Sequence, residues 1–330
     1  MSNILKKVSS GISGFDEIAR GGIPKGRTTL LSGASGTGKT VFSAQFLYKG
    51  IIDHRENGVF VTFEERPEDI IKNMKGFGWN VGKLEKEKKW AFVDASPGDA
   101  DAVEVGQYDL GAFMARVSYA IKKVGAKRVA IDSVSAIFTH FQDPGIIRRE
   151  LYRLTQMLKQ ANITCIMTAE RPNDGSAVSR YGVEEFVSDN VILLHNRLNG
   201  RGERERTVEV LKFRGTDHDS EEAPLIVNES GVNIYPRPKP RLSGKGFTKK
   251  ISTGIKGMDN LLYGGVYKNS TTLLTGASGT GKTVFALHFI IEGAKRGEES
   301  LLIEFEESPD QLYRNASSFG WDLKKYVDKG

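Results

Sequence analysis

Residues 33–42 read GASGTGKTVF, and this stretch decides the fold. The apolar, β-branched run 27–32 precedes it, and residues 40–52, which follow it, have helical patterning. A glycine-rich turn between a buried strand and a helix is the context in which the pattern Gly-x4-Gly-Lys-Thr forms a phosphate-binding loop (P-loop). The stretch therefore predicts a nucleotide site in an α/β fold.

The residues of this loop have separate chemical roles. Its glycines let backbone N–H groups turn inward onto phosphate oxygens, and the following helix adds its positive N-terminal end. Lys39 can reach the β- and γ-phosphates, and the Thr40 hydroxyl can ligate Mg²⁺. The predicted ATP contacts are Gly33, Ala34, Ser35, Gly36, Thr37, Gly38, Lys39, Thr40 and Val41.

Acidic residues end two further predicted strands. The apolar strand 128–132 ends in Asp132, which has the Walker B form and is predicted to hold Mg²⁺ together with Thr40. Glu64 and Glu65 close the strand 59–63. Ligands of open α/β sheets lie beyond the carboxyl ends of the strands, where a carboxylate can orient or deprotonate an attacking water. We therefore expect Glu64 and Glu65 to be catalytic.

The chain repeats this motif. Residues 33–42 recur letter for letter at 276–285, an offset of 276 − 33 = 243 residues. Such an offset indicates a duplicated domain, because solenoid repeats are only about 20–50 residues long. The second copy contains the counterpart of residues 10–88 and nothing later. Its predicted residues are the phosphate contacts Gly276, Ser278, Gly279, Thr280, Gly281, Lys282 and Thr283, with Thr283 also a metal ligand, and the catalytic acids Glu306 and Glu307.

The surplus of positive charge lies between the two copies. The 330 residues include 47 Lys and Arg against 41 Asp and Glu, a net charge of +6. Residues 236–250 hold six basic residues and no acid, which accounts for the whole surplus. A Pro-rich basic segment is typical of a stiff, solvated linker. A nucleic-acid-binding arm is the alternative, although the rest of the chain lacks the basic surplus of a DNA-binding protein. We expect a complete domain over 1–235, a linker over 236–250 and the first third of a second domain over 251–330, belonging to a longer two-domain protein or to a product that ends early.

Strands and helices alternate along the first copy, which predicts a mostly parallel sheet covered on both faces. Residues 207–213 alternate in polarity and predict a late antiparallel edge. Further strands are expected at 91–94, 164–168 and 191–195, and helices at 109–123 and after Pro67. Another helix is predicted from an apolar stripe with steps of four and three residues. The stripe consists of Ile147, Leu151, Leu154, Leu158 and Ala161.

Together these motifs resemble the KaiC family of RecA-like P-loop ATPases, and the likeness covers nearly all 330 residues. The resemblance implies a homohexameric ring with ATP and Mg²⁺ at each subunit interface, and slow ATP hydrolysis that serves as a timer or switch. The strings that carry it are SGTGKT at 35–40, VTFEE at 61–65, DASP at 94–97, IDSV at 131–134, RREL at 148–151, RYGVEEFVSDN at 180–190 and KFRGT at 212–216.

The resemblance also implies contacts from a neighbouring subunit. Lys212 and Arg214 alternate along a predicted strand, so both could project across an interface. A positive group supplied in trans can be worth about 10³–10⁵ in turnover. Asn228 and Glu229 replace a Thr-Asp pair that helps to bind base or ribose in the family. The residues that match the trans-acting strip are Lys212, Phe213, Arg214, Thr216 and His218.

Other functions stay open. The family also shows serine/threonine autokinase activity, with phosphorylation sites at positions later than residue 330. A RecA-type DNA-binding factor would bind single strands with a steep salt dependence, but the loop 171–181 has one aromatic residue and is a poor stacking platform. Intact Lys39, Glu64 and Asp132 argue against a scaffold without turnover. The expected partners are ATP, further copies of the chain and regulatory proteins, and not DNA.

Composition excludes several other classes. No apolar run approaches the roughly 18–20 residues of a membrane helix, and the N-terminus lacks the apolar stretch of a signal peptide, so we expect a cytoplasmic protein. The single cysteine, Cys165, excludes an internal disulfide and a cysteine-rich metal site, and we expect its thiol to be buried and inert. His195, His288, Trp79 and Trp321 are predicted to be packing residues.

Overall fold

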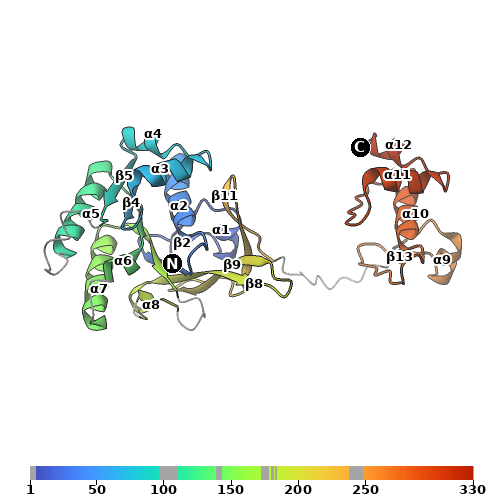
Figure 1. The fold of residues 1–330 in the computed structure, drawn as a ribbon. Helices are drawn as coiled ribbons and strands as arrows, with labels where there is room; N and C mark the ends of the chain where they lie inside the picture. The colour runs from blue at the N-terminus through green and yellow to red at the C-terminus, as the bar shows by residue number, and fades with distance from the viewer. Residues whose placement is uncertain are drawn as a thin grey trace. The chain divides into compact units, whose positions relative to one another are not determined.

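The computed structural model describes residues 5–96, 110–138, 143–171, 178–179, 182, 184–237 and 248–329. It divides the chain into two compact units, Met1–Lys239 and Pro240–Gly330 (Figure 1). The predicted linker 236–250 spans this division, and its residues 238–247 lie outside the described residues, as do residues 172–177 of the loop weighed for DNA binding. Residue 97 of the DASP string and residues 180, 181 and 183 of the RYGVEEFVSDN string also lie outside them.

Within the described part of the first unit, nine strands form one sheet in the order β11-β10-β9-β8-β3-β7-β6-β4-β5. The pairs from β8 to β5 are parallel, and β9, β10 and β11 continue the sheet as an antiparallel edge. This confirms the predicted α/β class and its late antiparallel edge. The strands are β3 (Thr28–Gly33), β4 (Gly58–Thr62), β5 (Trp90–Asp94), β6 (Arg128–Asp132), β7 (Thr164–Glu170), β8 (Asn190–Leu198), β9 (Arg204–Phe213), β10 (Ala223–Asn228) and β11 (Gly231–Ile234).

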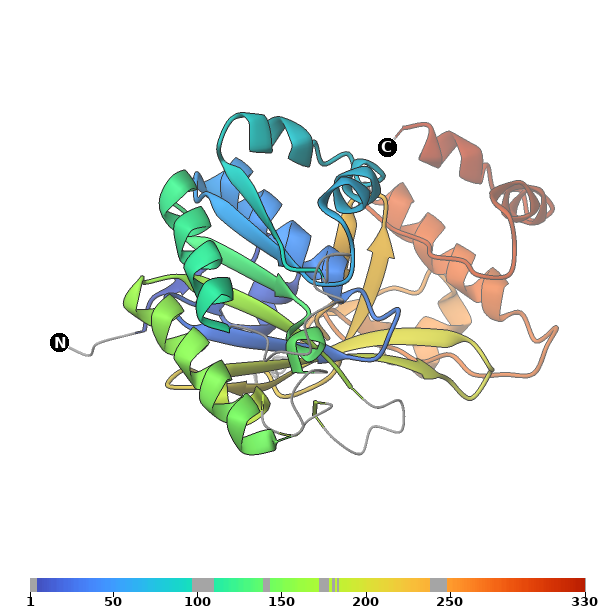
Figure 2. The ribbon, with the colours of Figure 1, turned by 60° about the vertical axis from the view of Figure 1, so that its left-hand side comes forward.

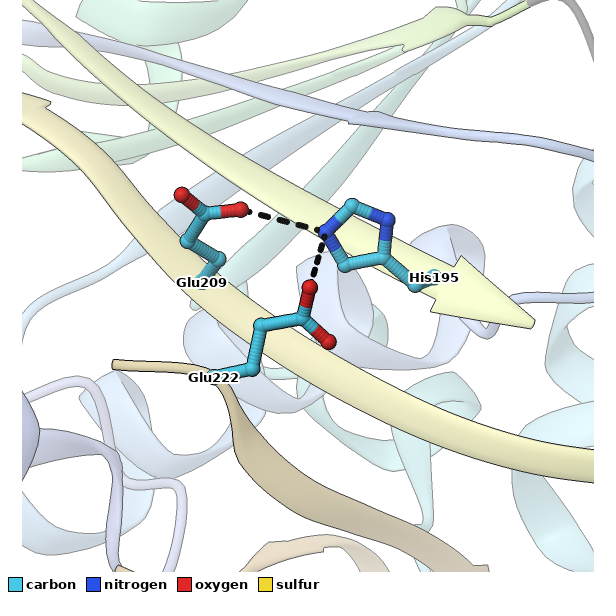
Figure 3. Close-up of side chains that lie close together, drawn as sticks. All are labelled: His195, Glu209 and Glu222. Carbon is cyan, nitrogen blue, oxygen red and sulfur yellow. Dashed lines mark hydrogen bonds and ion pairs between the residues drawn. The ribbon is translucent and has the colours of Figure 1, made fainter. Parts of the chain in front are cut away.

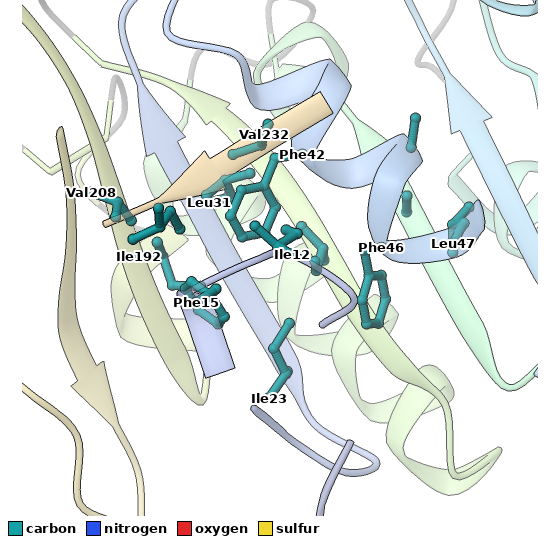
Figure 4. Close-up of a cluster of buried hydrophobic side chains, with 14 of the residues drawn as sticks. Ile12, Phe15, Ile23, Leu31, Phe42, Phe46, Leu47, Ile192, Val208 and Val232 are labelled. Atoms are coloured by element: carbon teal, nitrogen blue, oxygen red, sulfur yellow. The ribbon is translucent and has the colours of Figure 1, made fainter. Parts of the chain in front are cut away.

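Helices cover both faces of this sheet. Leu30 and Leu31 are consecutive in β3 and point to opposite faces, and each belongs to a different buried cluster. The cluster of Leu31 includes α2 (Figure 4), and that of Leu30 includes α5 and α7, which lie on the other side (Figure 2). The helices are α2 (Lys39–His54), α3 (Pro67–Lys75), α4 (Val81–Lys86), α5 (Leu110–Val124), α6 (Val134–Phe138), α7 (Pro144–Gln160) and α8 (Glu184–Val187).

One prediction about α7 is wrong at its end. Ile147, Leu151, Leu154 and Leu158 are buried as predicted, but Ala161 is exposed. Ala161 is the C-cap of α7, because the helix ends at Gln160. A residue past the last turn no longer follows the helical periodicity, so it leaves the apolar face.

The N-terminal segment contains elements that the sequence analysis did not predict. Strand β1 (Lys7–Val8) pairs antiparallel with β2 (Ile23–Pro24), and α1 (Phe15–Ile18) lies between them in the chain. The side chains of Ile12, Phe15 and Ile23 join the α2 side of the core (Figure 4). Trp79 is buried in this same cluster, and Cys165 is buried on the opposite face, both as predicted.

The second unit is built mainly from helices. They are α9 (Lys256–Leu261), α10 (Lys282–Lys295), α11 (Pro309–Ser317) and α12 (Leu323–Val327). Among its described residues the only paired strands are β12 (Lys250–Ile251) and β13 (Val266–Tyr267). Trp321 packs against a small core of α10, α11 and α12, and its ring lies 4.9 Å from that of His288. No helix in the described parts of the chain is long and apolar enough to cross a membrane.

Candidate active site

The predicted P-loop connects the end of β3 to the start of α2. Gly38 caps α2 with φ 99°, a left-handed conformation that glycine adopts without a steric cost. A Cβ on Gly33 would lie 2.7 Å from Thr37 Oγ1 and 2.8 Å from the Leu194 carbonyl oxygen. The Thr37 hydroxyl donates to the Ala34 carbonyl at 2.8 Å. Gly33, Ala34 and Thr37 therefore hold the shape of the loop.

Lys39 lies at the inner side of this loop. Its Nζ donates to the carbonyl oxygens of Gly33 at 2.9 Å and Ala34 at 3.0 Å. Burial lowers the pKa of Lys39, while the negative charges of Asp132, Glu170 and Glu64 act in the opposite direction. The ammonium group is thus the cation of an otherwise acidic pocket.

The loop borders a cavity of about 310 Å³ at the carboxyl edge of the sheet. Because the strands β3, β4, β6 and β7 are parallel, their carboxyl ends meet there. Nine of the residues predicted from the sequence line the cavity, together with three that were not predicted. The lining residues are Ser35, Gly36, Gly38, Lys39, Thr40, Val41, Thr62, Glu64, Glu65, Asp132, Ser133 and Glu170.

Thr40 and Asp132 meet inside this cavity although they are 92 residues apart. The Thr40 hydroxyl donates to Asp132 Oδ2 at 2.6 Å, and the Thr168 hydroxyl donates to Asp132 Oδ1. Mg²⁺ prefers hard oxygen donors and is usually held by one or two protein ligands beside phosphate and water. A threonine hydroxyl next to a carboxylate fits that requirement.

The two predicted catalytic glutamates have different surroundings. Ser133 Oγ donates to Glu64 Oε1 at 3.0 Å. Asn73 Nδ2 donates to Glu65 Oε2 at 3.1 Å. Burial and then the nearby charge of Asp132 raise the pKa of Glu65, and the hydrogen bond from Asn73 opposes this rise. A carboxylate with a raised pKa binds a proton more tightly, which suits Glu65 to accept one.

Sequence reasoning missed the lining residues Thr62, Ser133 and Glu170, and also Thr168, which bonds to Asp132. Ser133 directly follows Asp132, so its position alone could have suggested it. Glu170 was missed because the predicted strand ended at residue 168, whereas β7 continues to Glu170. The backbone N–H of Glu170 donates to Ser135 Oγ at 2.9 Å, which holds this strand end beside the one that carries Asp132.

The hairpin formed by β10 and β11 lies against the P-loop from another side. Val227 Cγ2 is 3.4 Å from the position that a Cβ on Gly38 would take. Asn228 Oδ1 accepts hydrogen bonds from the backbone N–H and hydroxyl of Ser230 and from Asn233. The Asn228 side chain is therefore engaged in its own turn.

None of the five residues of the predicted trans-acting strip lines the 310 Å³ cavity. Lys212 Nζ donates to the carbonyl oxygens of Glu185 and Ser188. Arg214 is half exposed, and its nearest guanidinium nitrogen is 3.8 Å from Asp189 Oδ1. Phe213 is only 6% exposed and packs in the core of its own unit. The role of the strip in trans stays a prediction.

His195 is buried, as expected of a packing residue, but its ring nitrogens contact charged side chains. Its Nε2 lies 3.3 Å from Glu209 Oε2 and 3.8 Å from Glu222 Oε1 (Figure 3). Its Nδ1 faces guanidinium nitrogens of Arg197 at 2.9 Å and Arg171 at 3.3 Å. Since a guanidinium only donates, Nδ1 is the acceptor and Nε2 carries the hydrogen.

This tautomer decides what the His195 network does. Burial first, and then the charge of Arg197, lower the pKa of His195, so the ring is neutral. In this tautomer Nε2 donates to Glu209, and the network joins β8 to β9 by a hydrogen bond.

The second copy reproduces the P-loop contacts within its own chain segment. Lys282 Nζ donates to the carbonyl oxygens of Gly276 at 2.8 Å and Ala277 at 2.9 Å. Asn315 Nδ2 donates to Glu307 Oε2 at 2.7 Å, as Asn73 does to Glu65. Thr283 has no counterpart of Asp132 within residues 1–330, because the offset of 242 residues that relates Glu65 to Glu307 places that counterpart at 132 + 242 = 374. The described residues of the second copy therefore reproduce the lysine contacts of the P-loop and the Asn–Glu pair of the first site.

Comparisons with known proteins cover both copies. A family model described as "ATPase: KaiC" matches residues 8–239 and 251–330. The circadian clock oscillator protein KaiC of Parathermosynechococcus lividus is 49% identical over 327 residues, which are 99% of this chain and 60% of that protein. That of Thermosynechococcus vestitus is 50% identical over 327 residues, or 99% of this chain and 62% of that protein.

The same protein of Synechococcus elongatus is 47% identical over 321 residues, or 97% of this chain and 62% of its own length. This chain therefore spans about 60% of the length of these relatives. Since the family model matches both copies and the likeness extends over nearly the whole chain, the chain belongs to the KaiC ATPase family.

Proposed function

We propose that the first unit binds ATP with Mg²⁺ in the 310 Å³ cavity and hydrolyses it. The observation that supports this is the convergence of a cation, a hydroxyl–carboxylate pair and two further carboxylates in one cavity. Lys39 supplies the cation, Thr40 and Asp132 form the pair, and Glu64 and Glu65 are the further carboxylates. These are the groups that phosphoryl transfer to water requires.

Each group has a defined part in the proposed reaction. The backbone N–H groups of residues 35–40 and Lys39 bind the phosphates, and Thr40 and Asp132 would hold Mg²⁺. The metal ion would neutralise charge on the β- and γ-phosphate oxygens. Glu65 takes a proton from the attacking water while Glu64, held by Ser133, orients it. A bond forms from the water oxygen to the γ-phosphorus, and the bond from that phosphorus to ADP breaks.

We further propose that a neighbouring copy completes the pocket in a ring, which the family resemblance gives as a hexamer. Arg214 is half exposed and lies outside the cavity of its own chain, as a group that acts in trans must. Slow hydrolysis in such a ring would serve as a timer or switch. The relatives' name, circadian clock oscillator protein, supports a timing role.

Phosphate release from γ-labelled ATP tests the hydrolysis. We expect Glu65→Gln to lower turnover about 10²–10⁴-fold, which is the usual contribution of a general base. Glu68→Gln, an exposed glutamate three residues further along and outside the cavity, is the matched control and should leave turnover unchanged. Equal turnover of wild type and Glu65→Gln would remove Glu65 from the mechanism.

The same experiment separates hydrolysis from kinase activity. A serine or threonine hydroxyl could replace water as the acceptor at these carboxylates, and label would then stay on protein. Label on the protein that survives Glu306→Gln but not Glu64→Gln would place the transfer in the first unit. Light scattering tests the ring: a six-fold mass that forms only with ATP and Mg²⁺ is expected, and a monomer in both states would contradict it.

A further inference from the structure

The residues of the strip that follow β9 lie in a turn. We call residues 214–219 the strip turn. It contains Gly215 with φ 74°, and Arg214, Thr216 and His218 are its predicted nucleotide contacts. Its internal side-chain bonds are local: the His218 backbone N–H donates to Asp217 Oδ1 at 2.9 Å, and His218 Nδ1 is 3.1 Å from the Asp219 carbonyl oxygen. Such bonds fix the turn's shape but not its position on the subunit.

The strip turn is held at its start by Asp189, whose carbonyl oxygen accepts from the Arg214 backbone N–H at 3.3 Å, and further along by the N-terminal segment, about 200 residues away in sequence. The Arg20 guanidinium forms an ion pair with Asp217 and lies 3.2 Å from Asp219 Oδ1. The Asp219 backbone N–H donates to the Ile18 carbonyl oxygen at 2.8 Å. Lys7 Nζ donates to the Asp217 carbonyl oxygen at 3.2 Å.

Lys7 also holds the end of α1 and the ring beside the turn. Its Nζ donates to the carbonyl oxygens of Ala19 at 2.6 Å and Arg20 at 3.1 Å, so all three N–H groups of the ammonium have carbonyl partners. The same Nζ lies 5.7 Å from the centroid of the Phe213 ring, which contacts His218 edge-on at 5.6 Å. Lys7 therefore connects α1, the end of β9 and the strip turn.

The other side of the N-terminal segment rests on α2, the helix that follows the P-loop. Gln45 Nε2 donates to the Gly11 carbonyl oxygen at 3.2 Å. Gly11 lies so close to Lys49 that a Cβ on it would be 2.2 Å from Lys49 Cβ. One short segment thus contacts both the helix of the subunit's own nucleotide site and the turn that is to serve the neighbour's.

We propose that Lys7 and Arg20 are positioning residues that hold the strip turn where Arg214 meets the nucleotide of the neighbouring subunit. This rests on the proposed function, in which Arg214 acts in trans. Neither residue touches the chain's own cavity, so each acts only through the turn. A displacement of about 1 Å in a catalytic group can cost about 10²-fold in rate, whereas exposed ion pairs contribute little to stability.

The test compares Arg20→Gln and Lys7→Met with a matched arginine. Arg55 also follows a helix in left-handed backbone (φ 57°, against 48° for Arg20), and it forms no ion pair with any residue that the structure describes, so Arg55→Gln is the control. We expect Arg20→Gln and Lys7→Met to lower phosphate release by isolated rings about 10- to 100-fold, and the melting temperature of Arg20→Gln to stay close to that of Arg55→Gln. Arg20→Lys, which keeps a cation near Asp217, should restore part of the turnover. Turnover equal to that of Arg55→Gln, or folded monomers that form no ring, would overturn the proposal.

Mixed rings give a readout that a purely structural defect would not produce. Subunits with Glu64→Gln and Glu65→Gln cannot hydrolyse ATP but present an intact strip turn. Mixed with Arg20→Gln subunits, they should raise turnover above the sum of the two separate populations, because some Arg20→Gln sites then face a normal neighbour. Absence of this gain overturns the proposal.

Arg214→Ala distinguishes the role of the strip in trans from the positioning role of Lys7 and Arg20. If the proposed function holds, Arg214→Ala lowers turnover by about 10³-fold or more and is rescued in the same mixed rings. Full turnover in Arg214→Ala would refute the role of the strip in trans. A large loss in Arg214→Ala beside normal turnover in Arg20→Gln and Lys7→Met would refute only the positioning role.

Discussion

The two copies of the P-loop stretch share ten identical residues, yet they fold into different surroundings. In both copies the loop closes on itself through the same bonds, and a helix follows, α2 in one and α10 in the other. The residues that precede the loop differ in structure between the two copies. Residues 28–33 form β3 between β7 and β8, whereas residues 271–275 form no strand. Leu30 is fully buried, and its counterpart Leu273 is 84% exposed.

The second strand of the repeat shows the same contrast. Residues 58–62 form β4 between β5 and β6, while residues 301–304 form no strand, and Leu301 and Phe305 are 81% and 93% exposed. The bonds of a loop or helix connect neighbouring residues, but those of a strand connect it to other segments. The identical P-loop stretches therefore have the same local structure, whereas the similar segments that precede and follow them form strands only in the first copy, where they have partners.

The largest expected difference between the copies is catalytic. Lys39→Ala should lower ATP turnover about 10²–10³-fold, because it removes the positioned cation from the cavity that contains Asp132. Lys282→Ala removes the same cation from a loop that has no counterpart of Asp132 in this chain, and turnover should be unchanged. Phosphate release at saturating ATP measures both. Equal losses would show that the second loop takes part in turnover.

Stability should separate the copies next. Leu30→Ala removes a fully buried side chain from β3 and should cost about 2–5 kcal/mol. Leu273→Ala changes an exposed side chain and should alter the free energy of unfolding by no more than about 0.5 kcal/mol. Urea denaturation followed by circular dichroism gives both values. A large loss in Leu273→Ala would mean that residues 271–275 pack as a strand in solution.

A smaller difference concerns pH. The hydrogen bond from Asn73 lowers the pKa of Glu65 against the larger effect of burial, so Asn73→Ala should raise that pKa further. Glu65 acts as a base only when ionised, and the acid limb of the kcat/KM profile should therefore move to higher pH. Asn315→Ala, the equivalent change in the second copy, should leave the profile in place. A shift of the acid limb to lower pH in Asn73→Ala would contradict this assignment of the base.

The smallest expected effect is one that the copies share. Asp16 accepts hydrogen bonds from Ser9 Oγ at 2.6 Å and from the Ser10 backbone N–H at 2.9 Å. Asp259 accepts from Ser252 Oγ at 2.5 Å and from the Thr253 backbone N–H at 2.8 Å. Asp16→Ala and Asp259→Ala should each weaken their turn by about 1 kcal/mol. Amide exchange at residues 10 and 253 measures this, and protection lost in only one copy would show that tertiary contacts support the other.

Most of the candidate site could be predicted because its residues belong to short motifs. Lys39 and Thr40 lie within eight residues of Gly33, and Glu64, Glu65 and Asp132 each end a recognisable apolar strand. Glu170 was not predicted because the sequence does not mark where β7 ends. The contacts of Lys7 and Arg20 were not predicted because their partners in the strip turn are about 200 residues away, and no local pattern links them.

The sequence by itself determined the P-loops, the helices that follow them and the Asp-bonded turns before them, since both copies form these elements. Their hydrogen bonds join residues only a few positions apart, so little chain entropy opposes them. Only the tertiary structure decided that residues 28–33 become a strand, that Thr40 meets Asp132, and that the N-terminal segment holds the strip turn. Each of these depends on distant segments, which a folded sheet brings within bonding distance and a sequence pattern does not.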